Sequence, residues 1–232
     1  MVAFELAVQD LEGVDIAARV GADRIELCAA LAVGGLTPSL GFIEAAAAGV
    51  PVHVLVRPRP GGFEHTSDEV ALIARDVRHA LAAGATGVVV GGTKDGVVDI
   101  DFVRAMTDAA GGAPVTFHRA FDTIDDRVSA LDVLADLGVT RVLTSGGRSS
   151  AIDARDELTR LARHADGRIE IMAGGGITDQ TAGLLLETGV DAIHASAKRL
   201  ASSTGIRLGS AGESVRETTD EAHAQRIRDL VR

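Results

Sequence analysis

The sequence of 232 residues contains no tryptophan and no tyrosine, and aromatic side chains make up only 3% of it. A hydrophobic core must therefore be built from alanine, valine, leucine and isoleucine, which suit close packing of helices on a sheet. Apolar residues form 46% and charged residues 24% of the chain, as in an ordinary globular domain. The length suits one large α/β domain, so we expect a single core.

Cysteine, long apolar runs and positive charge are also scarce. The one cysteine, Cys28, excludes an internal disulfide. No apolar run approaches the roughly 20 residues of a membrane span, and the N-terminus lacks a charged-then-apolar signal pattern. The formal net charge of -10 opposes binding to nucleic acid or to an anionic membrane surface. We therefore expect a cytoplasmic protein with neither nucleic-acid nor membrane partners.

One short motif recurs at the junctions between helical and strand patterns. Glycine ends an alanine- and leucine-rich helical pattern, a small apolar residue follows, and a strand pattern begins within a few residues. The copies begin at Gly21, Gly84, Gly138 and Gly189. Each interval of roughly 50 to 60 residues is about twice one strand-plus-helix unit, so a second strand is expected inside each interval.

Eight strand patterns therefore alternate with helical patterns. The strands are expected to begin at Phe4, Arg24, Val52, Gly87, Val115, Arg141, Ile169 and Asp191. The helices are expected at Leu11–Val20, Leu40–Ala48, Asp68–Ala83, Asp101–Ala109, Asp125–Leu137, Ala154–Ala165 and Thr178–Glu187. This order predicts one α/β domain over residues 1–232, a (β/α)8 TIM barrel with its core at about 2–198. The alternative is an open doubly wound sheet, which the lack of a Gly-x-Gly-x-x-Gly turn after the first strand disfavours.

The C-terminal extension over residues 199–232 has a different composition. Serine and glycine are frequent from Ser202 to Gly212, and no helical period returns until about Thr219. We predict a polar loop over 199–218 and a closing helix from about Thr219 to Val231. The sequence leaves open whether the loop is a mobile flap over the barrel mouth or a solvated connection.

The strand patterns carry polar residues on one face and apolar residues on the other. Glu26 and Cys28 alternate with Ile25 and Leu27, as the two-residue period of a strand requires. If helices cover the apolar face, the polar face must line the lumen, where its charges are paired or used. The residues early in their strands, for which a buried neutralising network is expected, are Glu5, Arg24, His53 and Glu170.

Late strand positions and the loops after them are the expected active site of such a barrel. Arg57 precedes Pro58 and offers donors suited to a carboxylate or phosphate, and Arg119 is a second clamp. His118 is a candidate for proton exchange near neutral pH, with Glu26 as an acidic partner. The predicted catalytic residues are Glu26, His118, Arg57, Arg119 and Asp122.

Glycine runs after two of the strands predict an anion site. Such turns expose backbone N–H groups ahead of helices, and this part of a TIM barrel often binds phosphate. The predicted anion-binding residues are Gly146, Gly147, Gly174, Gly175, Gly176 and Lys198. The alternative is that the glycines only form tight strand-to-helix turns.

A metal site is the other interpretation of the polar lumen. Cys28 with His118, or with His53 or His194, would combine thiolate and imidazole ligands, which suit Cu(I) or Zn(II). From these residues alone, Cu(I) and Zn(II) both remain open. The alternative is that Cys28 is a small buried thiol that behaves as a hydrophobic residue.

Several segments together resemble the copper homeostasis protein CutC family. They are Ala22–Cys28, Gly34–Ser39, Val56–Arg59, Thr116–Asp122, Arg141–Gly147 and Ile171–Gly176. The resemblance implies a cytoplasmic barrel with a role in copper homeostasis and Cu(I) binding. Cys28 alone matches the family's proposed thiolates, so a two-thiolate site within one chain is excluded. A site shared by two chains of a homodimer, or one of Cys28 with histidines, is left open.

Two functions are therefore expected as alternatives. One is a CutC-like copper homeostasis protein whose partner is copper. The other is a TIM-barrel enzyme that acts on a small anionic or phosphorylated metabolite by general acid/base chemistry.

Overall fold

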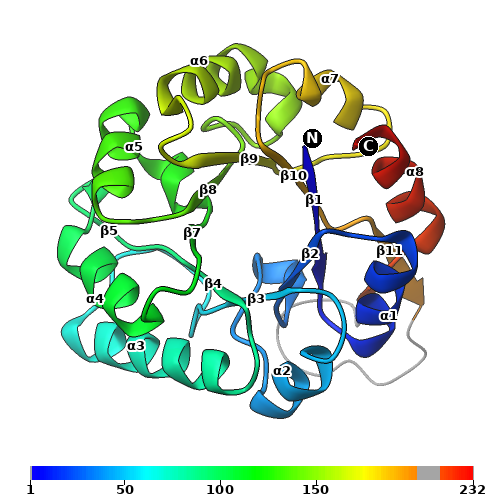
Figure 1. Cartoon of the computed structure of the whole chain (residues 1–232), viewed down its shortest axis with the longest axis horizontal. Helices are drawn as coiled ribbons and strands as arrows, with labels where there is room; N and C mark the ends of the chain where they lie inside the picture. The colour runs from blue at the N-terminus through cyan, green and yellow to red at the C-terminus, as the bar shows by residue number, and fades with distance from the viewer. Residues whose placement is uncertain (1, 203–214, 232) are drawn as a thin grey trace.

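A closed barrel of parallel strands forms the centre of the molecule in the computed structural model, which describes residues 2–202 and 215–231 (Figure 1). The strands are β1 (Ala3–Val8), β2 (Arg24–Leu27), β3 (Val52–Leu55), β4 (Gly87–Val90), β7 (Val115–Phe117), β8 (Arg141–Thr144), β9 (Glu170–Gly174) and β10 (Ala192–Ala195). They follow one another around the barrel in chain order, and β1 pairs with both β2 and β10. The predicted (β/α)8 TIM barrel is confirmed.

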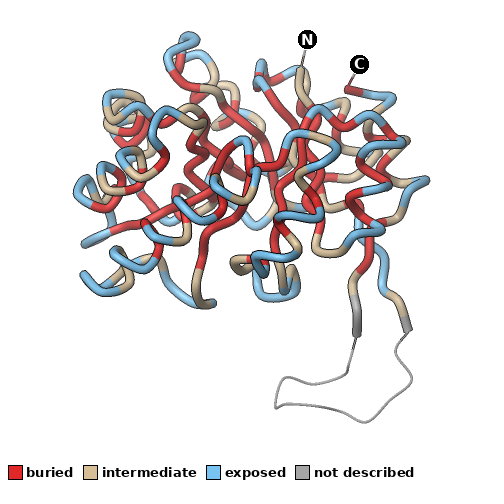
Figure 2. The backbone as a smooth tube through the Cα atoms, turned by 60° about the horizontal axis from the view of Figure 1, so that its bottom comes forward, coloured by how far each residue is buried: buried red, intermediate tan, exposed pale blue. Residues whose placement is uncertain are grey.

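Helices surround the barrel and bury its outer face (Figures 1 and 2). They are α1 (Leu11–Val20), α2 (Leu40–Ala46), α3 (Ser67–Ala82), α4 (Ile100–Ala110), α5 (Arg127–Asp136), α6 (Arg155–Ala165), α7 (Ala182–Leu186) and α8 (Glu221–Val231). Their buried residues recur at helical spacing, for example Val14, Ala17 and Val20 in α1. Within the described ranges, no helix combines the length and apolar character that crossing a bilayer requires.

The four glycine joints share a further contact that the sequence pattern does not reveal. The third residue of each joint hydrogen-bonds to the backbone of the preceding strand. These contacts are Asp23 Oδ2 with Phe4 N (2.7 Å), Thr86 Oγ1 with Val52 O (3.0 Å), Thr140 Oγ1 with Val115 N (3.3 Å) and Asp191 Oδ2 with Ile171 N (2.8 Å). The repeated motif therefore fastens the start of one strand to the strand before it, in four places around the barrel.

The lower lumen holds two ion pairs, of which Glu5–Arg24 is buried and Arg141–Glu170 reaches solvent through Glu170. Arg24 Nε donates to Glu5 Oε2 at 2.5 Å, and Arg141 Nε donates to Glu170 Oε2 at 2.7 Å. Arg141 also donates to Thr116 Oγ1. The expected neutralising network is present around Glu5, Arg24 and Glu170. The fourth expected member, His53, is buried, and its Nδ1 has no hydrogen-bond partner in the described part of the chain.

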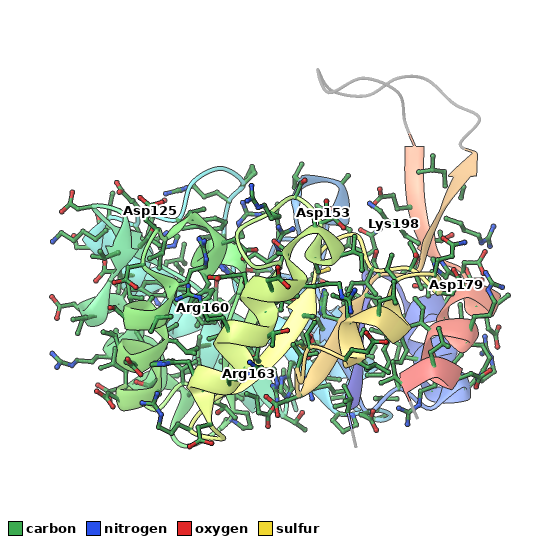
Figure 3. All side chains as sticks on the ribbon, turned by 90° about the horizontal axis from the view of Figure 1, so that it is seen from above. Asp125, Asp153, Arg160, Arg163, Asp179 and Lys198 are labelled. Atoms are coloured by element: carbon green, nitrogen blue, oxygen red, sulfur yellow. The ribbon has the colours of Figure 1, made fainter. Side chains whose placement is uncertain are left out.

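The predicted polar loop over 199–218 is wrong at both of its ends. Strand β11 (Lys198–Ser202) pairs antiparallel with β12 (Val215–Thr219), and this hairpin rises from the end of the barrel near Lys198 (Figure 3). Residues 203–214 lie outside the described residues. The closing helix is confirmed as α8, which begins after Asp220, whose Oδ1 accepts from His223 N at 2.8 Å.

A second short hairpin also differs from the sequence-based expectation. β5 (Thr93–Lys94) pairs with β6 (Val97–Val98) across a turn in which Asp95 and Gly96 have φ of 52° and 77°. Asp-Gly with two left-handed residues is typical of a tight hairpin turn. The strand pattern on either side was too short to indicate the hairpin.

Candidate active site in the barrel lumen

A cavity of about 680 Å³ opens at the carboxyl ends of the strands. Residues from most sides of the barrel line it. The polar side chains in this lining include those of Glu26, Arg57, His118, Arg119, His194 and Lys198. A cavity of this size suits a small molecule, and its position is where such barrels carry their chemistry. The structure therefore brings all five predicted catalytic residues, Asp122 included, to the lining of one cavity.

Glu26 belongs to a chain of charged groups that runs down into the barrel. His194 Nε2 lies 3.6 Å from Glu26 Oε2, and His194 Nδ1 lies 2.7 Å from Glu5 Oε1. Glu5 in turn accepts from Arg24. The strand register explains this alignment, because Glu5 of β1 stands directly beside both His194 of β10 and Arg24 of β2. Glu26 lies two residues further along β2, at the level of the cavity.

The two carboxylates of this chain have opposite electrostatic environments. Burial raises the pKa of Glu26 to about 7, and the nearby charge of Glu5 adds to this rise. Burial opposes the charge of Glu5 as well, but its hydrogen bond with His194 and the charges of His194 and Arg24 hold its pKa below the usual range. Burial opposes the charge of His194, but Glu26 and Glu5 outweigh it and raise the pKa of the imidazole. Glu26 is therefore the group of this chain that titrates near neutral pH.

His194 is absent from the predicted catalytic set. Its sequence context is weak, because it follows the Gly189 joint on the strand face that also carries Ser196 and Lys198. Its partnership with Glu26 depends on β1 standing between β2 and β10, which local spacing does not indicate.

His118 is held as a neutral hydrogen-bond donor, which differs from the expected proton exchange near neutral pH. Its Nδ1 accepts from Ala120 N at 3.1 Å, at the start of the short helix η2 (Arg119–Thr123), which places the proton on Nε2. Burial lowers the pKa of His118 to about 3, and the charge of Arg57 contributes. The ring packs on Gly91, where a Cβ would lie 2.3 Å from Nδ1 and Cε1.

Asp122 fills the glycine turn after β8 with its own carboxylate. Its Oδ1 accepts from Ser145 N and Gly147 N at 3.0 Å each and from Thr144 Oγ1 at 2.5 Å, and its Oδ2 accepts from Ser145 Oγ at 2.9 Å. Gly146 N donates to Thr144 Oγ1 at 2.9 Å. Gly147 N therefore binds a carboxylate of the same chain, whereas Gly146 N binds a hydroxyl. Asp122 also lines the cavity, and its catalytic role stays a prediction, as does anion binding by Gly146 and Gly147.

Arg119 connects Asp122 to the cavity. Its Nε donates to Asp122 Oδ2 at 2.7 Å, and its Nη2 donates to Ser145 Oγ at 2.7 Å. Its Nη1 lies beside Gly175, where a Cβ would come within 3.2 Å of it. No described residue accepts a hydrogen bond from Nη1, and the side chain is 41% exposed. One end of the guanidinium is thus fixed and the other is free to bind an anion.

The glycine turn after β9 differs from the turn after β8. Gly175 and Gly176 line the cavity and have φ of 106° and 67°, which favour glycine. Gly174 lies in β9 and packs on Leu143, so its predicted role in anion binding is not supported by its position. Lys198 lines the cavity, and its Nζ donates to Glu217 Oε1 at 2.6 Å.

Arg57, predicted as an anion clamp, is largely engaged by the backbone. Its Nη1 donates to the carbonyls of Val33 and Gly35, and its Nη2 donates to that of Gly61, each at 3.0 Å. The guanidinium also lies 5.4 Å from the centre of the Phe63 ring. Arg57 therefore holds the loops after β2 and β3 together beside the cavity, and its part as an anion clamp stays a prediction.

Cys28 lies apart from the cavity in a small apolar cluster with Leu55 and Val89. It is fully buried, its Sγ donates to Val8 O at 3.5 Å, and burial raises its pKa well above the usual range. In residues 2–202 and 215–231 no group of three or more histidine, cysteine, aspartate or glutamate side chains is arranged to hold a metal ion. The predicted pair of Cys28 and His118 therefore does not fit Cu(I), which prefers an accessible thiolate.

Comparison with known proteins identifies the family. The model of the CutC family matches residues 2–199. The chain belongs to the CutC family. A CutC family protein of Agrobacterium fabrum is 42% identical over 98% of this chain and 93% of its own. The Copper homeostasis protein cutC homolog of Homo sapiens is 43% identical over 84% of this chain and 73% of its own.

Solved structures agree with the CutC assignment. A crystal structure of CutC from Streptococcus agalactiae has a TM-score of 0.81 and 32% identity, and covers 84% of this chain and 99% of that one. The 3-hexulose-6-phosphate synthase of Salmonella typhimurium has a TM-score of 0.62 at 18% identity, covering 99% and 98%. The latter likeness shows only that the two chains share the barrel fold.

Proposed function

We propose that this CutC barrel is an enzyme that binds a small anionic molecule in its lumen and acts on it by general acid/base chemistry. The observation that supports this most strongly is the pair of Glu26 and His194, 3.6 Å apart and both facing the same cavity. Two neighbouring buried groups whose environments raise both of their pKa values are typical of acid/base sites.

Each polar group of the cavity has a distinct part in this proposal. Glu26 accepts or returns a proton, and His194 balances the charge of its carboxylate. Glu5 positions His194 from below through the 2.7 Å contact with Nδ1. Arg119 holds the anionic group of the ligand with Nη1, next to Gly175 and Gly176.

A binding screen with a matched control tests this function. We expect one or more phosphorylated or carboxylated metabolites to raise the melting temperature of the protein. The variant Arg119→Ala should lose this rise, whereas Arg163→Ala, an exposed arginine of α6 at the far end of the barrel (Figure 3), should keep it. If no anion raises the melting temperature, or if Arg119→Ala responds like the unchanged protein, the proposal fails.

Copper handling is a second proposal, which the printed name of the human relative supports. Full burial of Cys28 disfavours both a thiolate site within the chain and one shared by the two chains of a homodimer. We therefore propose that any role in copper homeostasis in the cytoplasm is exerted through the lumen ligand and not through a Cys28 copper site. Cu(I) titration against a competing chelator tests this, and stoichiometric binding that disappears in Cys28→Ser would contradict it.

A further inference from the structure

The cavity presents three different kinds of group on different walls. Glu26 ends β2, His118 follows β7, and Arg119 Nη1 lies beside the turn after β9. Strands β3 and β4 separate β2 from β7 on one side of the barrel, and β8 separates β7 from β9 on the other. A ligand held by its anionic group at Arg119 therefore reaches both a carboxylate and an imidazole.

We propose that this ligand carries a carbonyl group in addition to its anionic group, and that Glu26 removes a proton from the carbon next to the carbonyl while His118 Nε2–H binds the carbonyl oxygen. The inference rests on the proposed function and names its substrate class and reaction. It follows from the kind of hydrogen bond that each wall of the cavity offers.

His118 is a donor that stays neutral. The 3.1 Å bond from Ala120 N occupies Nδ1, and the close packing on Gly91 fixes the ring plane. Among the described residues no acceptor takes the Nε2–H, and the ring lines the cavity. A neutral imidazole is a poor proton source but a good partner for an oxygen on which negative charge develops. Carbonyl oxygens acquire such charge when the adjacent carbon loses a proton.

Glu26 is a base of suitable strength for this step. It is 6% exposed and faces the cavity, and the nearest cationic group is His194 at 3.6 Å. Its carboxylate is held by a single weak contact, whereas the carboxylate of Glu5 below it is engaged by both His194 and Arg24. Glu26 therefore keeps an oxygen available for a substrate proton.

Removal of the proton from the carbon next to the carbonyl needs no further reagent. The C–H bond breaks, its proton forms an O–H bond with Glu26, and its electron pair becomes the second bond between the two carbons. The carbonyl π pair moves to the oxygen, which accepts the hydrogen bond from His118. Return of the proton from Glu26 to the same carbon restores the ligand. In D2O the Glu26 O–H exchanges its proton for a deuteron of the solvent before the return, so a deuteron is added to the carbon instead.

Hydrogen–deuterium exchange measured by NMR in D2O tests the inference with three carbonyl phosphates as probes, dihydroxyacetone phosphate, glyceraldehyde 3-phosphate and ribulose 5-phosphate. Glycerol 3-phosphate, which lacks the carbonyl, is the control ligand. We expect at least one carbonyl phosphate to exchange the hydrogen next to its carbonyl. Glu26→Gln should lower the rate by about a hundredfold or more while leaving binding in place.

A matched pair of variants isolates the donor of His118. In His118→Gln the side-chain amide places an N–H near the position of the former Nε2, whereas the side chain in His118→Leu has no N–H. Both variants lose the Nδ1 acceptor. We expect His118→Leu to lower the maximal exchange rate by about a hundredfold with little change in the dissociation constant, and His118→Gln to recover part of it. Equal rates in the two variants would overturn the role of the Nε2–H.

The outcomes separate this inference from the proposed function. If phosphates bind through Arg119 and none of the carbonyl probes exchanges, the inference is overturned and anion binding stands. If no anion binds through Arg119, the proposed function fails, and the inference fails with it.

Discussion

The lower and upper halves of the lumen are built from the same strands but serve different purposes. Below, Glu5 and Arg24, and Arg141 and Glu170, form direct ion pairs. Above, Glu26 has one contact of 3.6 Å, and Arg119 keeps a free Nη1. Glu5 and Glu26 lie on neighbouring strands, yet their pKa values move in opposite directions. Two residues of rise along a strand therefore separate a carboxylate with a lowered pKa from one with a raised pKa.

A comparable difference exists between the glycine turns after β8 and β9. The first is filled by the carboxylate of Asp122, and the second lines the open cavity with Gly175 and Gly176. The same local sequence signal, consecutive glycines after a buried strand, thus leads to one occupied and one accessible turn. The difference is that the side chain of Asp122, which is distant in the sequence, reaches the turn after β8.

Removing a carboxylate from the lower layer should have the largest effect. Glu5→Gln leaves the buried Arg24 without its ionic partner, and we expect it to lower the free energy of unfolding by about 3–5 kcal/mol in urea denaturation. Glu26→Gln is the matched control, and at pH 5, where the raised pKa keeps Glu26 protonated in the folded state, we expect it to change stability by less than about 1 kcal/mol. Similar losses in the two variants would remove the distinction between the layers.

Emptying the turn after β8 should have the next largest effect. Asp122→Ala deprives two backbone N–H groups, two hydroxyls and Arg119 of an acceptor, so we expect a loss of about 2–4 kcal/mol. Formate or phosphate should raise the melting temperature of this variant more than that of the unchanged protein. Asp125→Ala, an exposed neighbour, is the control. The absence of any anion rescue would contradict the idea that Asp122 acts as an internal anion.

The dependence of stability on pH should distinguish Glu26 from Glu5. The pKa of Glu26 is raised in the folded state, so the folded protein binds more protons than the unfolded chain between about pH 4.5 and 7. Glu26 therefore costs stability as pH rises through this window, and Glu26→Gln should gain about 1–2 kcal/mol relative to the unchanged protein between pH 5 and 8. His194, Glu5 and Cys28 are the titratable groups that interact with it.

Glu5 has a lowered pKa, so its contribution has the opposite sign. The stability that it provides is present above pH 4.5 and is lost as pH falls towards its folded pKa. Urea denaturation at closely spaced pH values measures both contributions. A stability difference for Glu26→Gln that does not change with pH would contradict the assignment for Glu26.

The smallest effect is expected at Cys28. Cys28→Ala removes a buried sulfur from the cluster with Leu55 and Val89, and we expect a loss of about 1 kcal/mol with unchanged binding of lumen ligands. Thermal denaturation with and without ligand measures both quantities. A large loss of ligand binding would show that the thiol belongs to the functional site after all.

Local sequence features were sufficient to predict the barrel. The Gly21, Gly84, Gly138 and Gly189 joints and the two-residue period of the strands depend on neighbouring residues alone. The same period placed Glu26 and His118 correctly in the lumen. It could not pair Glu26 with His194, because that contact crosses β1 and depends on closure of the barrel.

The remaining errors arise where distant segments meet. Arg57 looked free in the sequence, but the carbonyls of Val33, Gly35 and Gly61 converge on it only in the folded loops. Strands β11 and β12 pair with each other, but residues 203–214 separate them in the sequence, so neither strand shows a local hairpin pattern. Nothing in a local window indicates such pairings.

The clamps formed by Asp23, Thr86, Thr140 and Asp191 have a consequence for how the barrel is divided. Each joins two strands that are consecutive in the chain, β1 with β2, β3 with β4, β7 with β8 and β9 with β10. The molecule is thus a ring of four quarter-barrel modules, each fastened internally. New chain termini introduced between modules, such as at Gly49 between β2 and β3, leave every clamp within an unbroken segment. Circular permutants cut there should therefore refold more readily than those cut inside a module.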